Sequence, residues 1–227
     1  MSGLFEILLN LFAKPTPSPL PGNVTPTPTP VPVPPPDPKP VFTEPEVVGP
    51  QCSIYRNCRI EQGRANDVAM VGKLIVGNRA RYEEVDLGIP WYVIGMIHQR
   101  ECSGNFNQHL HNGDPLSART KHVPMGRPVS GEPPFTWLDS ARDALIFDRL
   151  DHKASWTLEE TLDRLERYNG LGYRQHGIRS PYLWGATTAQ RPGKYTADGH
   201  LDPAVYDKQV GCAAVLKWLE ALGHVQL

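Results

Sequence analysis

The stretch IHQRECSGNFNQHLHNGDP, residues 97–115, decides how the rest of the chain is interpreted. An apolar run ends within it and a polar loop begins, and Glu101 lies at the junction. Residues 90–102 begin with a proline, which suits the first turn of a helix, and their apolar side chains recur at helical spacing. The sequence therefore predicts a helix over residues 90–102, with Glu101 in its last turn.

A glutamate is a poor structural choice for that position. The C-terminal end of a helix carries partial negative charge, so cations are preferred there. The helix dipole and the burial implied by the apolar run both disfavour the charged form of Glu101, which predicts a raised pKa. A carboxyl group with a raised pKa can protonate a glycosidic oxygen near neutral pH. Glu101 is therefore a candidate catalytic acid.

Two motifs in the chain resemble those of a known superfamily. RECSGNFN, residues 100–107, resembles the glutamate–serine motif that follows the catalytic helix of lysozymes. ERYNGLGYR, residues 166–174, resembles the YNAG segment of goose-type lysozymes and soluble lytic transglycosylases, which lies on the opposite wall of the sugar cleft. Most of residues 91–220 is similar to phage and bacterial peptidoglycan hydrolases of the endolysin type. The resemblance implies a mainly α, lysozyme-like domain with a small β/loop region, which cuts the glycan strand of peptidoglycan.

The resemblance also assigns roles to individual residues. It places Glu101 at the catalytic acid and Tyr168 with Asn169 at the pair that shapes the cleft. Cys102 stands where serine is common, Gly170 stands in place of alanine, and the GLMQ segment of transglycosylases is not visible. These departures favour hydrolysis by a muramidase-like enzyme and leave lytic transglycosylation open.

The second catalytic carboxylate is harder to place. By its position in the loop, Asp114 is the first candidate for the base or nucleophile that a glycosidase needs across the sugar. Asp139 is the second candidate, and it equally suits a charge at a helix N-terminus. A turn residue in NGDP is the commoner role for an aspartate such as Asp114. Some lysozyme relatives use the acetamido group of the substrate instead.

Aromatic and imidazole side chains supply the predicted substrate contacts. Tyr182 and Trp184 in SPYLWG are expected on loops, where aromatic faces can stack on pyranose rings. Either residue, taken alone, is more often part of a core. His109 and His111 lie in the polar loop and are expected to donate hydrogen bonds to the substrate.

Two alternatives come from other classes of protein. His98, His109 and His111 resemble a zinc site, and Asp114 adds a further ligand, which would suit a cell-wall peptidase. No HExxH or HxxEH motif accompanies them, so we predict no metal site. The second alternative is a non-catalytic module that binds the cell wall.

The composition excludes one class of partner. The chain has 227 residues and a formal net charge of −1, so it lacks the strongly basic patch typical of nucleic-acid binding. No glycine-rich phosphate loop or serine elbow is present, and we expect a monomer without a cofactor. A pairing of Cys52 with Cys58 stays open, whereas Cys102 and Cys212 lie in apolar helical contexts that predict buried thiols.

The chain divides into three parts. Residues 1–14 predict a short amphipathic helix. Its role is a peripheral membrane contact through residues 2–14, the docking of a partner, or packing on the domain. Residues 15–50 hold fifteen of the 24 prolines and predict an extended polyproline spacer. Residues 51–227 form the predicted lysozyme-like catalytic domain, which would act on the bacterial cell wall.

Further helices are predicted within the domain from apolar spacing and from capping residues. Residues 157–168 carry the capping box TLEE, and Thr136 is a candidate cap for the helix that follows it. Any strand is expected around residues 118–124. The other helices are predicted over residues 65–85, 136–150 and 202–222.

Overall fold

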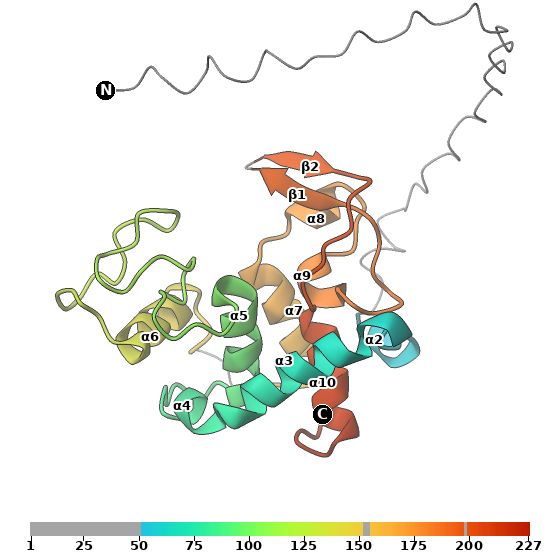
Figure 1. Cartoon of the computed structure of the whole chain (residues 1–227), viewed down its shortest axis with the longest axis horizontal. Helices are drawn as coiled ribbons and strands as arrows, with labels where there is room; N and C mark the ends of the chain where they lie inside the picture. The colour runs from blue at the N-terminus through green and yellow to red at the C-terminus, as the bar shows by residue number, and fades with distance from the viewer. Residues whose placement is uncertain (1–50, 152–154, 198) are drawn as a thin grey trace, which may run out of the picture. The chain divides into compact units, whose positions relative to one another are not determined.

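The structure is a computed structural model that describes residues 51–151, 155–197 and 199–227 (Figure 1). The predicted helix of residues 1–14 and the predicted spacer of residues 15–50 lie outside the described residues. The described part is mainly helical and contains one two-stranded sheet, so the expected fold class is confirmed at that level.

Helix α5, Trp91–Cys102, lies at the centre of the domain, and it forms where the sequence predicts it. Its residues from Tyr92 to His98 are all buried, because α5 is covered by neighbouring elements on every side. Gly95 allows the closest of these approaches, since a Cβ at this position would lie 2.5 Å from the side chain of Ile75. The helix ends at Ser103, whose φ of 52° is left-handed.

The prediction of one continuous helix over residues 65–85 is wrong. The chain forms α3, Ala65–Gly77, and α4, Arg79–Glu83, with Asn78 between them at a φ of −105°. Glycine and asparagine are weak helix formers, and their succession ends the first helix. Helix α3 packs against α5 and against the last helix of the chain.

Helices α6, Trp137–Phe147, and α7, Leu158–Tyr168, begin at the predicted caps. The Thr136 side chain accepts the Asp139 N–H and the Asp139 carboxylate accepts the Thr136 N–H, which makes a capping box. Thr157 and Glu160 form the same arrangement at the start of α7, as predicted. Asp139 therefore serves the helix N-terminus.

Two predictions about the C-terminal part and the sheet are wrong. The last helix, α10, spans Cys212–Ala221 and begins later than expected, because Asp202 ends a strand and its carboxylate accepts the Ala204 N–H in a turn. The strands are β1, Lys194–Ala197, and β2, His200–Asp202, which pair antiparallel. Residues 118–124 form no strand, because backbone groups there bond to side chains.

Four short helices complete the described part, and the segment between α5 and α6 contains neither helix nor strand. We call that segment the 103–136 loop. Together with α6 it forms one side of the domain, whereas α7, α8 and the β1–β2 hairpin lie across α5 from it (Figure 1). The short helices are α2, Gln51–Asn57, η1, Gln62–Arg64, α8, Gly172–Gln175, and α9, Pro181–Trp184.

Two further features concern the thiol state of the cysteines and the length of the helices. All four cysteines are free thiols, and Cys102 and Cys212 are buried as predicted. Among the described helices none combines the length and the apolar character needed to span a bilayer.

Candidate active site

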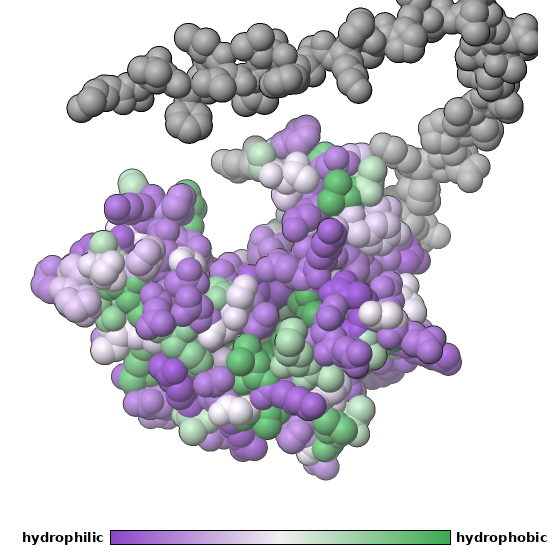
Figure 2. Space-filling view, viewed as in Figure 1, coloured by the Kyte–Doolittle hydropathy of each residue, from purple (hydrophilic) through white to green (hydrophobic). Residues whose placement is uncertain are grey.

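Glu101 lies in the last turn of α5, between the two sides of the domain. Its neighbour Cys102 donates a hydrogen bond to the carbonyl of His109 in the 103–136 loop, at 3.0 Å. On the other side Arg100 pairs with Asp207 at 3.1 Å, and Asp207 also pairs with Lys194 of β1. Figure 2 shows the surface hollowed between the 103–136 loop and the part that carries β1 and β2, with mostly hydrophilic residues around the hollow.

The pKa of Glu101 is raised, as the sequence predicts. Its side chain is half-buried, and desolvation by burial raises the pKa to about 7. The Tyr182 hydroxyl and the Arg100 guanidinium oppose this rise, whereas the charge of Asp148 adds to it. A carboxyl group of this kind keeps its proton to near neutral pH and still reaches the surface, so it can act as a proton donor.

Two tyrosines from different helices lie beside Glu101. Tyr168, at the end of α7, is half-buried, and its hydroxyl donates to the carbonyl of Leu110 at 3.3 Å. Tyr182, in α9, is buried, and its hydroxyl approaches Glu101 without reaching standard hydrogen-bond geometry. Burial raises the pKa of both phenols, and the charge of Glu101 raises them further. The structure thus brings Tyr168 and Tyr182 to Glu101.

The expected stacking roles of Tyr182 and Trp184 are wrong. Both residues lie in the short helix α9 and not on an open loop, and their exposed fractions are 2% and 1%. A ring covered to this extent has no free face for a sugar. Asn169 follows Tyr168 as the C-cap of α7; it is exposed, and its amide donates to Ser180 at 3.4 Å.

Asp114 holds the 103–136 loop in shape. Its carboxylate accepts the N–H groups of Lys121 and His122 at 2.7 and 3.0 Å, and one oxygen lies 2.7 Å from the His122 ring. Desolvation acts to raise the pKa of Asp114, but the bonds from His122 and Lys121 outweigh it and bring the pKa to about 2. A carboxylate occupied in this way fits the turn role better than that of a catalytic base.

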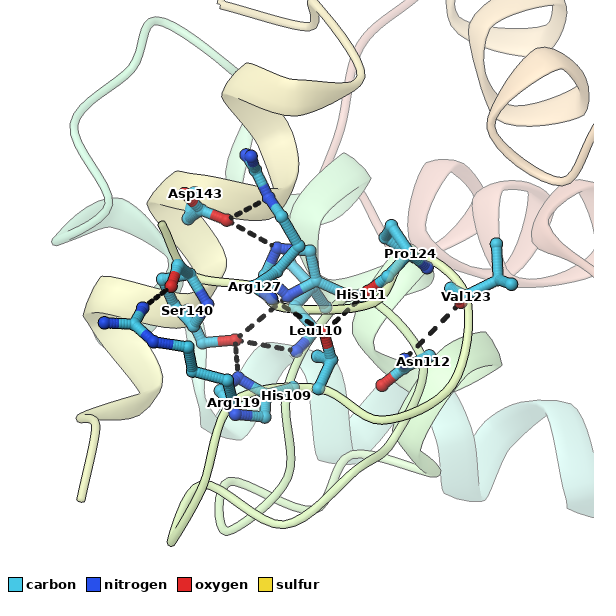
Figure 3. Close-up of polar contacts among 12 residues, drawn as sticks. His109, Leu110, His111, Asn112, Arg119, Val123, Pro124, Arg127, Ser140 and Asp143 are labelled. Carbon is cyan, nitrogen blue, oxygen red and sulfur yellow. Dashed lines mark hydrogen bonds and ion pairs between the residues drawn. The ribbon is translucent and has the colours of Figure 1, made fainter. Parts of the chain in front are cut away.

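His109 and His111 do not face the solvent, which corrects their expected role in substrate binding. His109 lies between the Ser140 hydroxyl, at 2.9 Å, and the Ala118 carbonyl, at 2.8 Å. The His111 ring lies 2.8 Å from the carboxylate of Asp143. Figure 3 shows both rings directed toward α6. They join the loop to that helix.

His98 is also committed to internal contacts. The Trp137 indole donates to its Nε2 at 3.1 Å, and the Tyr82 hydroxyl lies 3.2 Å from its Nδ1. An indole N–H can only donate, so Nε2 carries no proton. Burial lowers the pKa of His98 to about 4. Among the described residues no group of three His, Cys, Asp or Glu side chains is arranged to hold a metal ion.

Asp148 is a residue of this region that sequence reasoning missed. It caps the C-terminal end of α6 and lines a cavity of about 680 Å³ together with Tyr168. Desolvation by burial raises its pKa to about 6, although Arg127 lowers it. Nothing in the spacing of the chain points to this aspartate, because only the fold brings the end of α6 close to the end of α5.

Comparison of the chain with models of known protein families, with curated proteins and with solved structures found no match.

Proposed function

We propose that the chain is a peptidoglycan hydrolase with a lysozyme-like domain. Glu101 is the general acid in the cleavage of the glycan strand of peptidoglycan. One observation carries the proposal: a half-buried carboxyl group with a pKa of about 7 lies in the last turn of α5, and the residues on either side of it contact the two sides of the domain. The motifs around Glu101 and Tyr168 supply the substrate class by resemblance.

The chemistry follows from the protonation state of Glu101. Below about pH 7 the carboxyl group holds its proton, and it donates that proton to the oxygen between two sugars as the bond from C1 to that oxygen breaks. The leaving sugar departs with a neutral hydroxyl group, so no alkoxide has to form. Glu101 becomes a carboxylate beside the oxocarbenium-like sugar.

The residues around Glu101 maintain this state. Desolvation by burial disfavours the charged form of the carboxyl group, and the charge of Asp148 adds to this effect. Asp207 engages Arg100, which limits the stabilising effect of that guanidinium on a charged Glu101. Asn169 follows Tyr168 and is exposed, which supports a proposed contact with an amide or hydroxyl group of the sugar.

The experiment compares two glutamates that each lie at the end of a helix. Glu101→Gln keeps the shape of the side chain and removes the acid, and we expect the release of reducing ends from purified sacculi to fall by about 10²–10⁴-fold. Glu84→Gln is the matched control, because Glu84 caps the end of α4 with an exposed side chain. The control should retain the rate of the wild type.

Analysis of the products by mass separates the competing functions. Ordinary reducing ends mean hydrolysis, whereas anhydro-sugar ends, lighter by one water, mean transglycosylation. New amino groups that disappear with a chelator would instead identify a zinc peptidase. Binding to sacculi with no cleavage by the wild type would identify a wall-binding module. Undiminished sugar cleavage by Glu101→Gln would overturn the role of Glu101.

A further inference from the structure

We infer that Asp148 is the second catalytic carboxylate, the base that takes a proton from the water attacking the sugar. The inference rests on the proposed function of Glu101 and extends it to the other half of the reaction. It begins from the placement of Asp148 at the end of α6, on the wall of the cavity of about 680 Å³.

Tyr168 connects the two carboxyl groups. It lines the same cavity as Asp148, and its phenol is subject to the charges of both Glu101 and Asp148. The charge of Asp148 also acts on Glu101 itself. Tyr168 therefore lies near both carboxyl groups, that of Glu101 in the last turn of α5 and that of Asp148 at the end of α6. An acid and a base in an inverting glycosidase need this proximity without direct contact, because a water molecule stands between them.

Asp148 differs from the other aspartates near the site in having a free carboxylate. Within the described residues its carboxylate takes part in no hydrogen bond or ion pair. Asp148 is exposed as a residue, whereas its carboxyl group is surrounded by enough protein to be partly desolvated. The neighbouring aspartates are all engaged by cations, ring nitrogens or backbone N–H groups. These are Asp114 with His122, Asp139 with Thr136, Asp143 with His111 and Arg127, and Asp207 with Arg100.

The two carboxyl groups lose their protons in a useful order. Burial raises the pKa of Asp148 to about 6 and that of Glu101 to about 7. The charge of Asp148 raises the pKa of Glu101 further, which favours Asp148 as the charged base and Glu101 as the protonated acid.

Charged groups from four parts of the chain face Asp148. Arg127 of the 103–136 loop favours its ionised form, Arg149 follows it and lines the cavity, and Arg174 of α8 lines the cavity and pairs with Glu166. The α7 wall carries both signs of charge, and Arg164 and Arg167 there pair with acids of the same helix. The other charged groups on that wall are Glu159, Glu160 and Asp163.

The step balances with water as the co-reactant. Asp148 accepts one proton of the water, the water oxygen bonds to C1, and the bond from C1 to the bridging oxygen breaks. Glu101 supplies the proton that the bridging oxygen needs. The products are two sugar hydroxyl groups, a protonated Asp148 and an ionised Glu101, and the two carboxyl groups then return to their starting states by exchange with solvent.

The test compares Asp148→Asn with Glu84→Gln on purified sacculi at pH 6.5. Glu84 is an exposed carboxylate at the C-cap of α4, as Asp148 is at the C-cap of α6, and it lies outside the cavity lining, so it serves as the matched control. We expect Asp148→Asn to release reducing ends about 10²–10⁴-fold more slowly than the wild type and Glu84→Gln to keep the rate. Azide is a nucleophile that does not have to be deprotonated, so added sodium azide should restore cleavage by Asp148→Asn. The product is then a glycosyl azide, which mass spectrometry detects. Azide should not restore cleavage by Glu101→Gln, because that variant lacks the acid.

The pH profile gives a second readout. Asp148→Asn should lose the fall in rate below about pH 6, and its fall on the alkaline side should move to lower pH, because Glu101 loses a negative neighbour. Asp148→Glu should retain part of the rate and show that the fold tolerates change at this position. A wild-type rate in Asp148→Asn, with Glu101→Gln inactive, would overturn the role of Asp148 alone. Absence of sugar cleavage by the wild type would instead overturn the proposed function.

Discussion

The Arg100 guanidinium lies 3.1 Å from the Asp207 carboxylate, and the two side chains are only 7% and 3% exposed. Desolvation acts to raise the pKa of Asp207, but Arg100 and then Lys194 outweigh it and keep the pKa below its ordinary value. This buried pair joins the last turn of α5 to the segment before α10. It also fixes the residue that directly precedes Glu101.

Removal of one partner from this pair should be costly. Asp207→Asn leaves the buried guanidinium uncompensated, so we expect the free energy of unfolding to fall by about 3–5 kcal/mol. Asp67→Asn is the matched control, because it breaks the exposed pair with Arg64, in which Asp67 is 51% exposed. That loss should stay within about 1 kcal/mol. Urea unfolding at pH 7 measures both, and equal losses in the two variants would contradict the prediction.

Glu101 should lower the free energy of unfolding at alkaline pH. Its pKa is about 7 in the folded chain and 4.5 ordinarily, so the folded state binds the proton more tightly. The stability that this provides is present below about pH 4.5 and is lost as the pH rises through 7. Glu101→Gln should therefore exceed the wild type at pH 8, by an amount on the order of 1–3 kcal/mol, and match it near pH 4. The same difference at both pH values would refute this account.

His98 should have the opposite effect. Its pKa is about 4 in the folded chain and 6.5 ordinarily, so the unfolded chain takes up the proton first. The stability is present above about pH 6.5 and is lost as the pH falls through 4. His98→Gln keeps an acceptor for the Trp137 indole and removes the titration. We expect the variant to lose less stability than the wild type between pH 7 and pH 4.5 in guanidinium unfolding, whereas His200→Gln, at an exposed position, should follow the wild type.

Two glycines of α3 should respond oppositely to the same substitution. A Cβ at Gly72 would lie 2.2 Å from the Trp218 ring, whereas a Cβ at Gly77 would meet nothing within 4 Å. Gly72→Ala should therefore destabilise the fold by about 1–3 kcal/mol. Gly77→Ala should stabilise it by about 0.5–1 kcal/mol, because alanine favours a helix. The melting temperatures of the two variants test the pair, and a stabilised Gly72→Ala would show that α10 can move away from α3.

The helices were predictable to the extent that local signals define them. Apolar spacing located α5, and the threonine caps located the starts of α6 and α7. The break at Asn78 and the late start of α10 were missed, because proline and aspartate at residues 202–203 suit a turn after a strand as well as a helix cap. The hairpin was missed because its strands are short.

The candidate site was predictable in part for a similar reason. The position of Glu101 at a helix end follows from the sequence, and so does the direction of its pKa. The partners of His109 and His111 are Ser140 and Asp143, which lie about thirty residues further along the chain. Asp148 is equally remote from Glu101 in sequence. Such long-range contacts leave no local pattern, so only the fold could reveal them.

The internal contacts of the 103–136 loop should protect it from cleavage by proteases. It contains neither helix nor strand, yet Asp114 and His109 tie its backbone together and His111 attaches it to α6. Loops are usually the first sites of proteolytic nicking, because their backbone is free to enter a protease cleft. We therefore expect trypsin to spare Arg119 and Lys121 in the native protein and to cut after Lys121 faster in Asp114→Ala, which loses the bonds to the N–H groups of Lys121 and His122.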